Sequence, residues 1–155
     1  ELTGLSELAD AYPRTLSYGQ KRRLAVAAAL ALKPRVLILD EITGGQDAIE
    51  KEAVLSVLKR LNEEQGVTII LITHDMSTVL RYAGRAIVMA QGAVAFDGAP
   101  QALFAGGHPL AEWGLSCPPV AAVAGTLLPG EAAPIDAAAL CQVLIEKMRR
   151  NGSCN

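Results

Sequence analysis

The chain has 155 residues, a formal net charge of −2 and a hydrophobic fraction of 51%. This length allows one domain with a buried core, and the longest apolar run, residues 24–32, is far shorter than the roughly 20 residues of a membrane-spanning helix. The weak negative charge and the 4% aromatic content give no reason to expect a nucleic-acid partner. The cysteines, Cys117, Cys141 and Cys154, lack metal-ligand spacing and fit a reducing cytoplasm.

Helices and strands are predicted to alternate up to residue 98. Apolar residues three or four positions apart indicate helices, whereas continuous apolar runs indicate strands buried on both faces. In chain order we expect a short helix at 2–11, a helix at 18–32, a strand at 35–41, a loop at 43–47, a helix at 48–64, a strand at 67–73, a helix at 76–82 and two strands around a turn at 91–92. This alternation predicts an α/β fold with a mostly parallel sheet.

The composition changes after Gly98. Residues 108–134 are rich in proline, glycine and alanine, which predicts an irregular tail with short helices. Helical spacing returns at residues 135–150.

Two of the predicted strands end in polar residues. VLILDE ends in Asp40 and Glu41, and ITHD places His74 and Asp75 after the second buried strand. Ligands bind at the carboxyl edge of such sheets, so Asp40 could hold Mg²⁺, Glu41 could orient a water and His74 could donate to a phosphate. Taken singly, each residue also has an ordinary explanation as the end of a strand or, for Asp75, as a helix N-cap.

The stretch LSYGQKRR, residues 16–23, begins a predicted helix. A helix N-terminus presents free N–H groups and partial positive charge, and Gly19 would let an anion approach the backbone closely. Taken alone, Ser17 is an ordinary N-cap and the basic residues 21–23 are a solvated face.

Together these stretches resemble the ATP-binding cassette (ABC) ATPases. LSYGQ resembles the signature motif of that family, VLILDE its Walker B strand, GGQD its D-loop and ITHD its H-loop, in the family's order and spacing. VMAQGAVAFDGAP is similar to the closing strands, so the resemblance covers residues 1–105 and leaves 106–155 as a C-terminal extension. Within it, WGLSCPPVAAVA is similar to the extension of energy-coupling-factor importer ATPases of the cobalt and vitamin type.

The resemblance implies roles for individual residues in binding and hydrolysing ATP with Mg²⁺. Asp40 would support Mg²⁺, Glu41 would be the catalytic base and His74 would contact the γ-phosphate. The residues implied to act across a dimer are Asp47, which couples the two sites, and Ser17, Gly19 and Gln20, which touch the γ-phosphate of ATP held by the other subunit.

Three positions depart from the family's usual pattern. Tyr18 replaces the first glycine of the signature pair, a change found in several importer ATPases. Ile42 replaces a proline and Gln46 replaces a leucine. The last two lie in and before the segment that resembles the D-loop, whose geometry couples the two sites in this family.

No Walker A loop or Q-loop is found in these residues. None of the five lysines follows a glycine, which excludes the Gly-Lys pair of a phosphate loop. The resemblance therefore implies the C-terminal portion of a three-layer P-loop NTPase fold, without its N-terminal strands and P-loop. We expect these residues alone to hydrolyse ATP at a background rate, and their apolar strand edges to favour self-association.

The function implied by the resemblance is that of an ATP-hydrolysing subunit of an importer of the energy-coupling-factor type. Its partners would be a second ABC ATPase subunit and transmembrane subunits, on the cytoplasmic face of the cell membrane. Chromosome-maintenance and DNA-repair ATPases share three of the motifs, but they usually carry long coiled-coil arms before the signature. A non-catalytic dimerisation or regulatory fragment is the other alternative, since the proline- and alanine-rich tail permits it.

Overall fold

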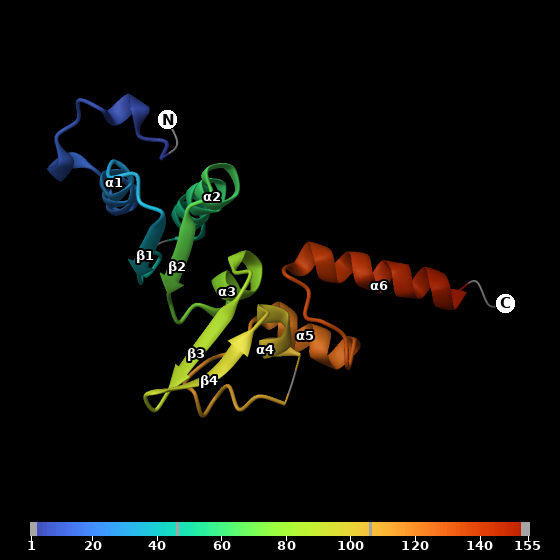
Figure 1. The fold of residues 1–155 in the computed structure, drawn as a ribbon. Coiled ribbons are helices and arrows are strands. Elements are labelled where there is room, and N and C mark those ends of the chain that lie inside the picture. The colour runs from blue at the N-terminus through green and yellow to red at the C-terminus, as the bar shows by residue number, and fades with distance from the viewer. Residues whose placement is uncertain (1–2, 46, 106, 153–155) are drawn as a thin grey trace. The chain divides into compact units, whose positions relative to one another are not determined.

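The computed structural model describes residues 3–45, 47–105 and 107–152, which form two compact units that divide after Thr73. The first unit contains the 3₁₀ turns η1 (Ser6–Leu8) and η2 (Pro13–Thr15), helices α1 (Tyr18–Leu30) and α2 (Ala48–Gln65), and strands β1 (Val36–Asp40) and β2 (Thr68–Ile72) (Figure 1). The second contains helices α3 (Met76–Tyr82), α4 (Pro100–Phe104), α5 (Pro119–Leu127) and α6 (Ala137–Gly152), and strands β3 (Ala86–Ala90) and β4 (Ala93–Gly98). The boundary predicted at residue 105 rests on family resemblance and stays a prediction.

A parallel strand pair forms the centre of the first unit. β1 and β2 pair in register from Val36 opposite Thr68 to Asp40 opposite Ile72, so their carboxyl ends lie at one edge. Leu37 and Leu39 of β1 are buried, as are the four apolar residues that α2 turns inward, Val54, Leu55, Leu58 and Leu61. The α/β fold class is confirmed: the first unit has this small parallel sheet, and the second has a separate antiparallel hairpin.

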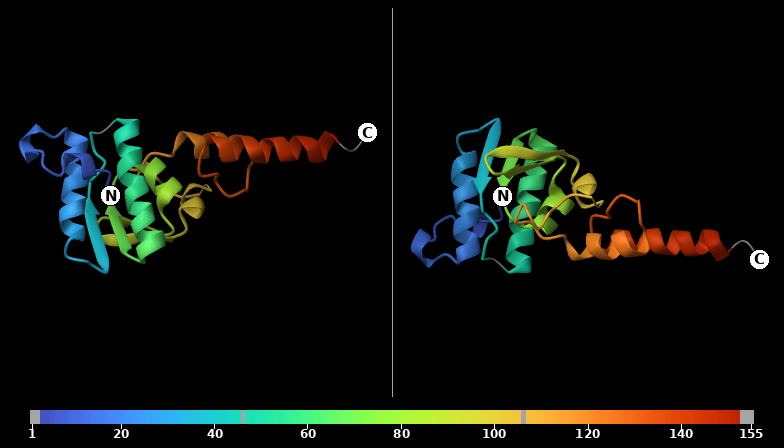
Figure 2. Two further views of the ribbon diagram at one scale, coloured as in Figure 1. Left: turned by 90° about the horizontal axis from the view of Figure 1, so that it is seen from above. Right: turned by 90° about the horizontal axis from the view of Figure 1, so that it is seen from below.

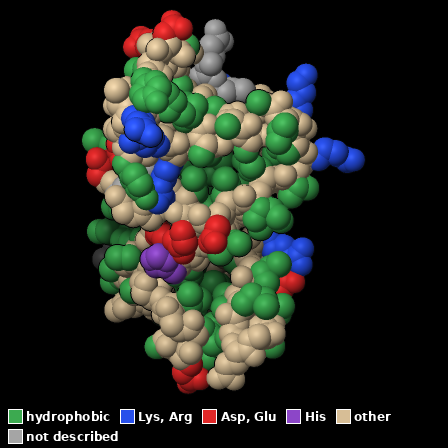
Figure 3. Space-filling model, turned by 90° about the vertical axis from the view of Figure 1, so that its left-hand side faces the viewer, with side chains coloured by type: hydrophobic (Ala, Val, Ile, Leu, Met, Phe, Trp, Pro, Cys, Tyr) green, Lys and Arg blue, Asp and Glu red, His purple; other side chains and the backbone are tan. Residues whose placement is uncertain are grey.

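The opposite face of the strand pair is open. The side chains of Val36, Ile38, Ile70 and Ile72 are 50%, 62%, 46% and 52% exposed. The prediction that both strands are buried on both faces is therefore wrong for the residues that the structure describes, since only one face is covered. Hydrophobic side chains open to solvent are also visible in the space-filling view (Figure 3).

The predicted helix at residues 2–11 is also wrong. Among the described residues of this segment, only the short turn η1 is helical. Gly4 adopts a left-handed backbone conformation (φ 63°), which interrupts a right-handed helix. Leu2 lies outside the described residues.

The second unit is organised around the β3–β4 hairpin. Its two-residue turn is Gln91-Gly92, as predicted, with φ of 50° and 78°. A cluster that includes Leu80 and Phe104 forms its core, and Trp113 packs against that cluster. Figure 2 shows α6 as one unbroken helix toward the C-terminus. Over the described ranges, no helix is both long and apolar enough to cross a membrane.

Candidate functional site

The N-terminus of α1 is closed by a capping box. Ser17 Oγ accepts a hydrogen bond from the Gln20 N–H (3.2 Å), and Gln20 Oε1 accepts one from the Ser17 N–H (2.8 Å). This reciprocal pair satisfies two backbone donors at the start of the helix and confirms Ser17 as the N-cap. The sequence predicted the cap but not the use of the Gln20 side chain within it.

Gly19 is buried in the first turn of α1. A Cβ atom at this position would lie 2.6 Å from Cδ of Glu50 and 2.7–2.8 Å from its carboxylate oxygens. Glu50 belongs to the first turn of α2. Glycine thus allows the start of α1 to pack closely against the start of α2.

Asp40 and Glu41 follow directly from the parallel strands. Asp40 is the last residue of β1 and is exposed, whereas Glu41 is half-buried. The Glu41 N–H donates to the Ile72 carbonyl (3.0 Å), and the Glu41 carbonyl accepts from the Gly44 N–H (3.1 Å). The backbone of Glu41 is therefore fixed between the end of β2 and the turn that follows β1.

Glu41 has a left-handed backbone conformation, with φ of 48°. Two other described non-glycine residues have positive φ: Lys33 follows the end of α1 and Gln91 lies in the hairpin turn, where such values have a local origin. For Glu41 the conformation costs on the order of 1 kcal/mol and needs support from its surroundings. Strained backbone of this kind concentrates at functional sites.

Arg22 supplies part of this support. Its Nη1 donates to the carbonyl oxygen of Glu41 (2.9 Å) and to that of Ile42, and its Nη2 donates to the Tyr18 hydroxyl (2.6 Å). The guanidinium also lies 4.6 Å from the centre of the Tyr18 ring. The interpretation of residues 21–23 as a solvated face is therefore wrong for Arg22, which is half-buried. The four-residue spacing of Tyr18 and Arg22, which places both side chains on one face of the helix, is the sequence signal that could have identified their contact.

Asp47 and Asp75 both act as helix N-caps. Asp47 Oδ1 accepts from the Glu50 N–H (2.8 Å) at the start of α2. Asp75 accepts from the N–H groups of Ser77 and Thr78 at the start of α3, as predicted. Gln46, beside Asp47, lies outside the described residues.

The seven predicted site residues are divided between the two units. His74 is exposed and begins the second unit. The other six belong to the first unit, where Arg22 connects the capped start of α1 with the turn at Glu41. These six are Ser17, Gly19, Gln20, Asp40, Glu41 and Asp47.

The donor set is compatible with a magnesium nucleotide. Among the described residues no group of three or more His, Cys, Asp or Glu side chains could hold a metal. Mg²⁺ usually takes only one or two protein carboxylates and fills its remaining positions with water and phosphate oxygens. The exposed carboxylate of Asp40 fits that requirement, and the exposed helix start at Ser17 fits a phosphate group.

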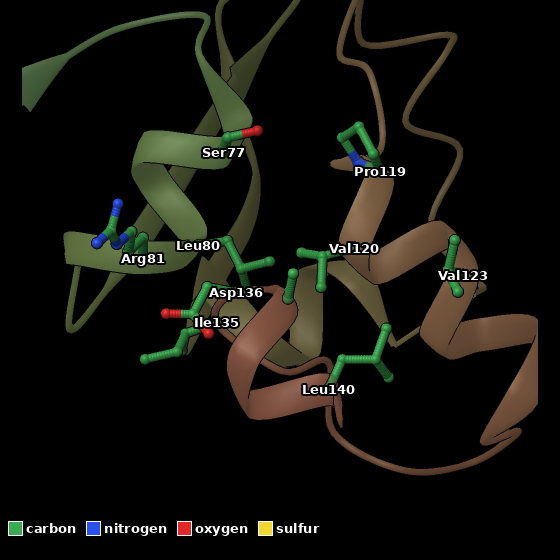
Figure 4. A pocket seen from close by; sticks show the side chains of 10 residues that line it. Ser77, Leu80, Arg81, Pro119, Val120, Val123, Ile135, Asp136 and Leu140 are labelled. Atoms are coloured by element: carbon green, nitrogen blue, oxygen red, sulfur yellow. The ribbon is translucent and has the colours of Figure 1, made fainter. Parts of the chain in front are cut away.

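A separate hollow lies within the second unit. It has a volume of about 460 Å³ and lies between α3, α5 and the beginning of α6 (Figure 4). Leu80, Val120 and Leu140 line it with apolar surface, and Arg81 and Asp136 supply charge. It contains none of the predicted site residues.

Comparison with known proteins gives a consistent result. The family model described as ABC transporter matches residues 1–44. The methionine import ATP-binding protein MetN of Bifidobacterium longum is 49% identical over 105 residues, which are 68% of this chain and 26% of MetN. The energy-coupling factor transporter ATP-binding protein EcfA1 of Caldanaerobacter subterraneus is 44% identical over 124 residues, which are 80% of this chain and 44% of EcfA1.

Solved structures agree with these relatives. cbiO1 from Clostridium perfringens, part of the ABC transporter complex cbiONQ, is 36% identical with a TM-score of 0.66, over 83% of this chain and 47% of cbiO1. The dimeric bacterial ABC transporter cassette MJ0796 is 35% identical with a TM-score of 0.56, over 64% of this chain and 43% of that one. The chain thus spans less than half the length of these proteins.

Proposed function

Because the chain belongs to the ABC transporter ATPase family, we propose that it is part of the ATP-binding and ATP-hydrolysing subunit of an importer. The observation that carries the proposal is the juxtaposition of two motifs in one unit. Arg22 connects the capped start of α1, which has the signature sequence, to the turn after the Walker B strand. The matches to MetN, which is named for import, and to EcfA1, which is named for transport, each include at least two thirds of the chain.

In this proposal the carboxylates divide the chemistry. Asp40 holds Mg²⁺ through its exposed carboxylate, and the ion neutralises charge on the phosphates when it is bound. Glu41 orients a water molecule and accepts its proton. His74 donates a hydrogen bond to the γ-phosphate.

The proposed site is shared between two subunits. Ser17, Gly19 and Gln20 stand at the start of α1, where helix N–H groups favour an anion. They contact the γ-phosphate of ATP held by a second ABC ATPase subunit, and Asp47 couples the two sites. The dimeric state of the related cassette MJ0796 supports this arrangement. Transmembrane subunits complete the importer, with the ATPase on the cytoplasmic face of the membrane.

Within the importers we favour the energy-coupling-factor type of the cobalt and vitamin class. MetN has the higher identity, but its match includes 105 residues, whereas the EcfA1 match includes 124 and the cbiO1 match 83% of the chain. The longer matches include part of residues 106–155, the region that we propose is a C-terminal extension. These longer matches support the energy-coupling-factor type over the methionine type.

Uptake into vesicles tests the proposed function. The complete ATPase, reconstituted with the transmembrane subunits of its importer, should drive ATP-dependent uptake of Co²⁺ or of a vitamin and not of methionine. A Glu41→Gln variant is the matched control and should abolish uptake. Methionine uptake would contradict the assignment to the energy-coupling-factor type, and an absence of ATP-dependent uptake of all three solutes would contradict the cobalt and vitamin class.

A further inference from the structure

We propose that Arg22 is a positioning residue for Glu41, fixing the backbone of the catalytic base from the helix that begins with the signature motif. The inference rests on the proposed function, because it takes Glu41 as the base that orients the attacking water. The motif resemblance assigns no role to Arg22, and the role is inferred from its contacts.

The contacts of Arg22 converge on one turn. Nη1 donates to two successive carbonyl oxygens, those of Glu41 at 2.9 Å and of Ile42, nineteen and twenty residues further along the chain. Hydrogen bonds from a charged donor are stronger than neutral ones, and here they are directed at backbone rather than at a mobile side chain. Arg22 therefore acts on the path of the chain at Glu41.

The position of the guanidinium is itself fixed. Tyr18, one helical turn earlier on α1, accepts a hydrogen bond from Nη2 at 2.6 Å, and the guanidinium lies against its ring. Tyr18 occupies the position where the family usually has glycine, so this anchor follows from a departure in the sequence. A planar fork of donors is needed to reach both the hydroxyl and the carbonyls, which lysine does not provide.

Glu41 requires such support because of its left-handed backbone conformation (φ 48°). Its N–H is bonded to the Ile72 carbonyl and its carbonyl accepts from Gly44. Without Arg22 the carbonyls of residues 41 and 42 lose their charged donor, so the turn can relax toward ordinary values of φ. Because hydrolysis depends on accurate positioning, a small displacement of Glu41 should slow the chemical step and leave nucleotide binding intact.

The test uses the complete ATPase that contains these residues, with MgATP as the probe. In Arg22→Gln we expect kcat to fall by about 10-fold or more, because displaced catalytic groups cost rates of this order. KM and the Kd for MgATP should stay within about twofold of wild type, because the groups that bind nucleotide are unchanged. Lys21→Gln, which removes a charge from the adjacent exposed position, is the matched control and should keep the wild-type kcat.

Two milder variants keep the test decisive if Arg22→Gln does not fold. Arg22→Lys retains the positive charge but not the planar fork of donors, and Tyr18→Phe removes only the hydroxyl group that accepts from Arg22 Nη2. Each variant should therefore lower kcat by less than Arg22→Gln does, while KM is maintained. Wild-type kcat in the Arg22 variants would overturn the inference. A fall in kcat accompanied by a similar weakening of MgATP binding and by a lower melting temperature would also overturn it. ATP hydrolysis that persists in Glu41→Gln would instead contradict the proposed function, so the two failures are distinguishable.

Discussion

Gly19 of α1 lies directly against the carboxylate of Glu50, so that a methyl group at Gly19 would come within 2.6 Å of Glu50 Cδ. Glu50 stands three residues after Asp47, whose carboxylate accepts a hydrogen bond from the Glu50 N–H. The start of the signature helix is therefore in contact with the first turn of α2, directly after the segment that resembles the D-loop. This contact is local to the first unit and joins two motifs that are far apart in sequence.

The effect of Gly19→Ala on the free energy of unfolding should depend strongly on the side chain at Glu50. Alanine favours a helix over glycine by up to about 1 kcal/mol, but here its methyl group must displace the carboxylate. We expect Gly19→Ala to stabilise the chain only in a Glu50→Ala background and to give no gain in the wild-type background. Urea unfolding of the wild type, the two single variants and the double variant measures the coupling, and strictly additive free energies would contradict the close contact.

The two roles assigned to Ser17 can be separated by one substitution. Aspartate caps a helix about as well as serine, whereas alanine at an N-cap costs about 1 kcal/mol. Ser17→Asp should therefore keep the free energy of unfolding, and Ser17→Ala should lower it. In the complete ATPase, however, Ser17→Asp should strongly reduce hydrolysis, because its carboxylate would face the γ-phosphate of the other subunit. Wild-type turnover in Ser17→Asp would exclude a phosphate contact at this position.

The open face of β1 and β2 should make the isolated 155 residues self-associate. Ile38 and Ile70 are opposite each other in the register, and their side chains are 62% and 46% exposed. Threonine at both positions keeps β-branching while removing apolar surface, so the double variant should sediment at a lower mass. Ile49→Thr, at an 83% exposed site on α2, is the control and should change nothing. A wild-type chain that is already a folded monomer would contradict this prediction.

Acid should weaken the ion pair across the β3–β4 hairpin. Arg85 Nε and Nη2 donate to the two carboxylate oxygens of Asp97, each at 2.7 Å. The side-chain hydrogen bond from Arg85 lowers the pKa of Asp97. The resulting stability is present above the unfolded-state pKa of about 3.9 and is lost as the pH falls through the lower folded value.

An NMR titration of the Asp97 carboxyl group measures this effect. Its pKa should lie below the usual aspartate value and should rise in Arg85→Gln. Arg60→Gln, which removes an arginine bonded to Glu64 in the first unit, should leave it unchanged. Identical titration of Asp97 with and without Arg85 would show that the pair has no effect in solution.

The sequence predicted the elements whose signals are local. The Ser17 and Asp75 caps and the Gln91-Gly92 turn depend on residues within a few positions of each other, and the structure contains them where they were expected. The helix at residues 2–11 was wrong because leucine spacing did not reveal the left-handed conformation of Gly4.

The remaining differences depend on distant parts of the chain. Continuous apolar residues in β1 indicated that both faces of the strand are buried. Burial also requires an element that covers each face, and within the part of the chain that the structure describes none covers Ile38, which is exposed. The bracing of Glu41 by Arg22 spans nineteen positions and leaves no periodic signal. The order of the motifs identified the family, whereas the contact that Arg22 makes between two of them is seen only in the three-dimensional structure.

Phosphate release from MgATP tests the central claim most directly, measured for the complete ATPase and for these 155 residues alone. The complete enzyme should turn over, and Glu41→Gln should abolish its activity, because Glu41 is proposed to activate the attacking water. The 155 residues alone should release phosphate only at the background rate, since none of their lysines follows a glycine to form a phosphate loop. Turnover by the complete enzyme that persists in Glu41→Gln, or Mg²⁺-dependent turnover by the 155 residues that Glu41→Gln abolishes, would contradict the account.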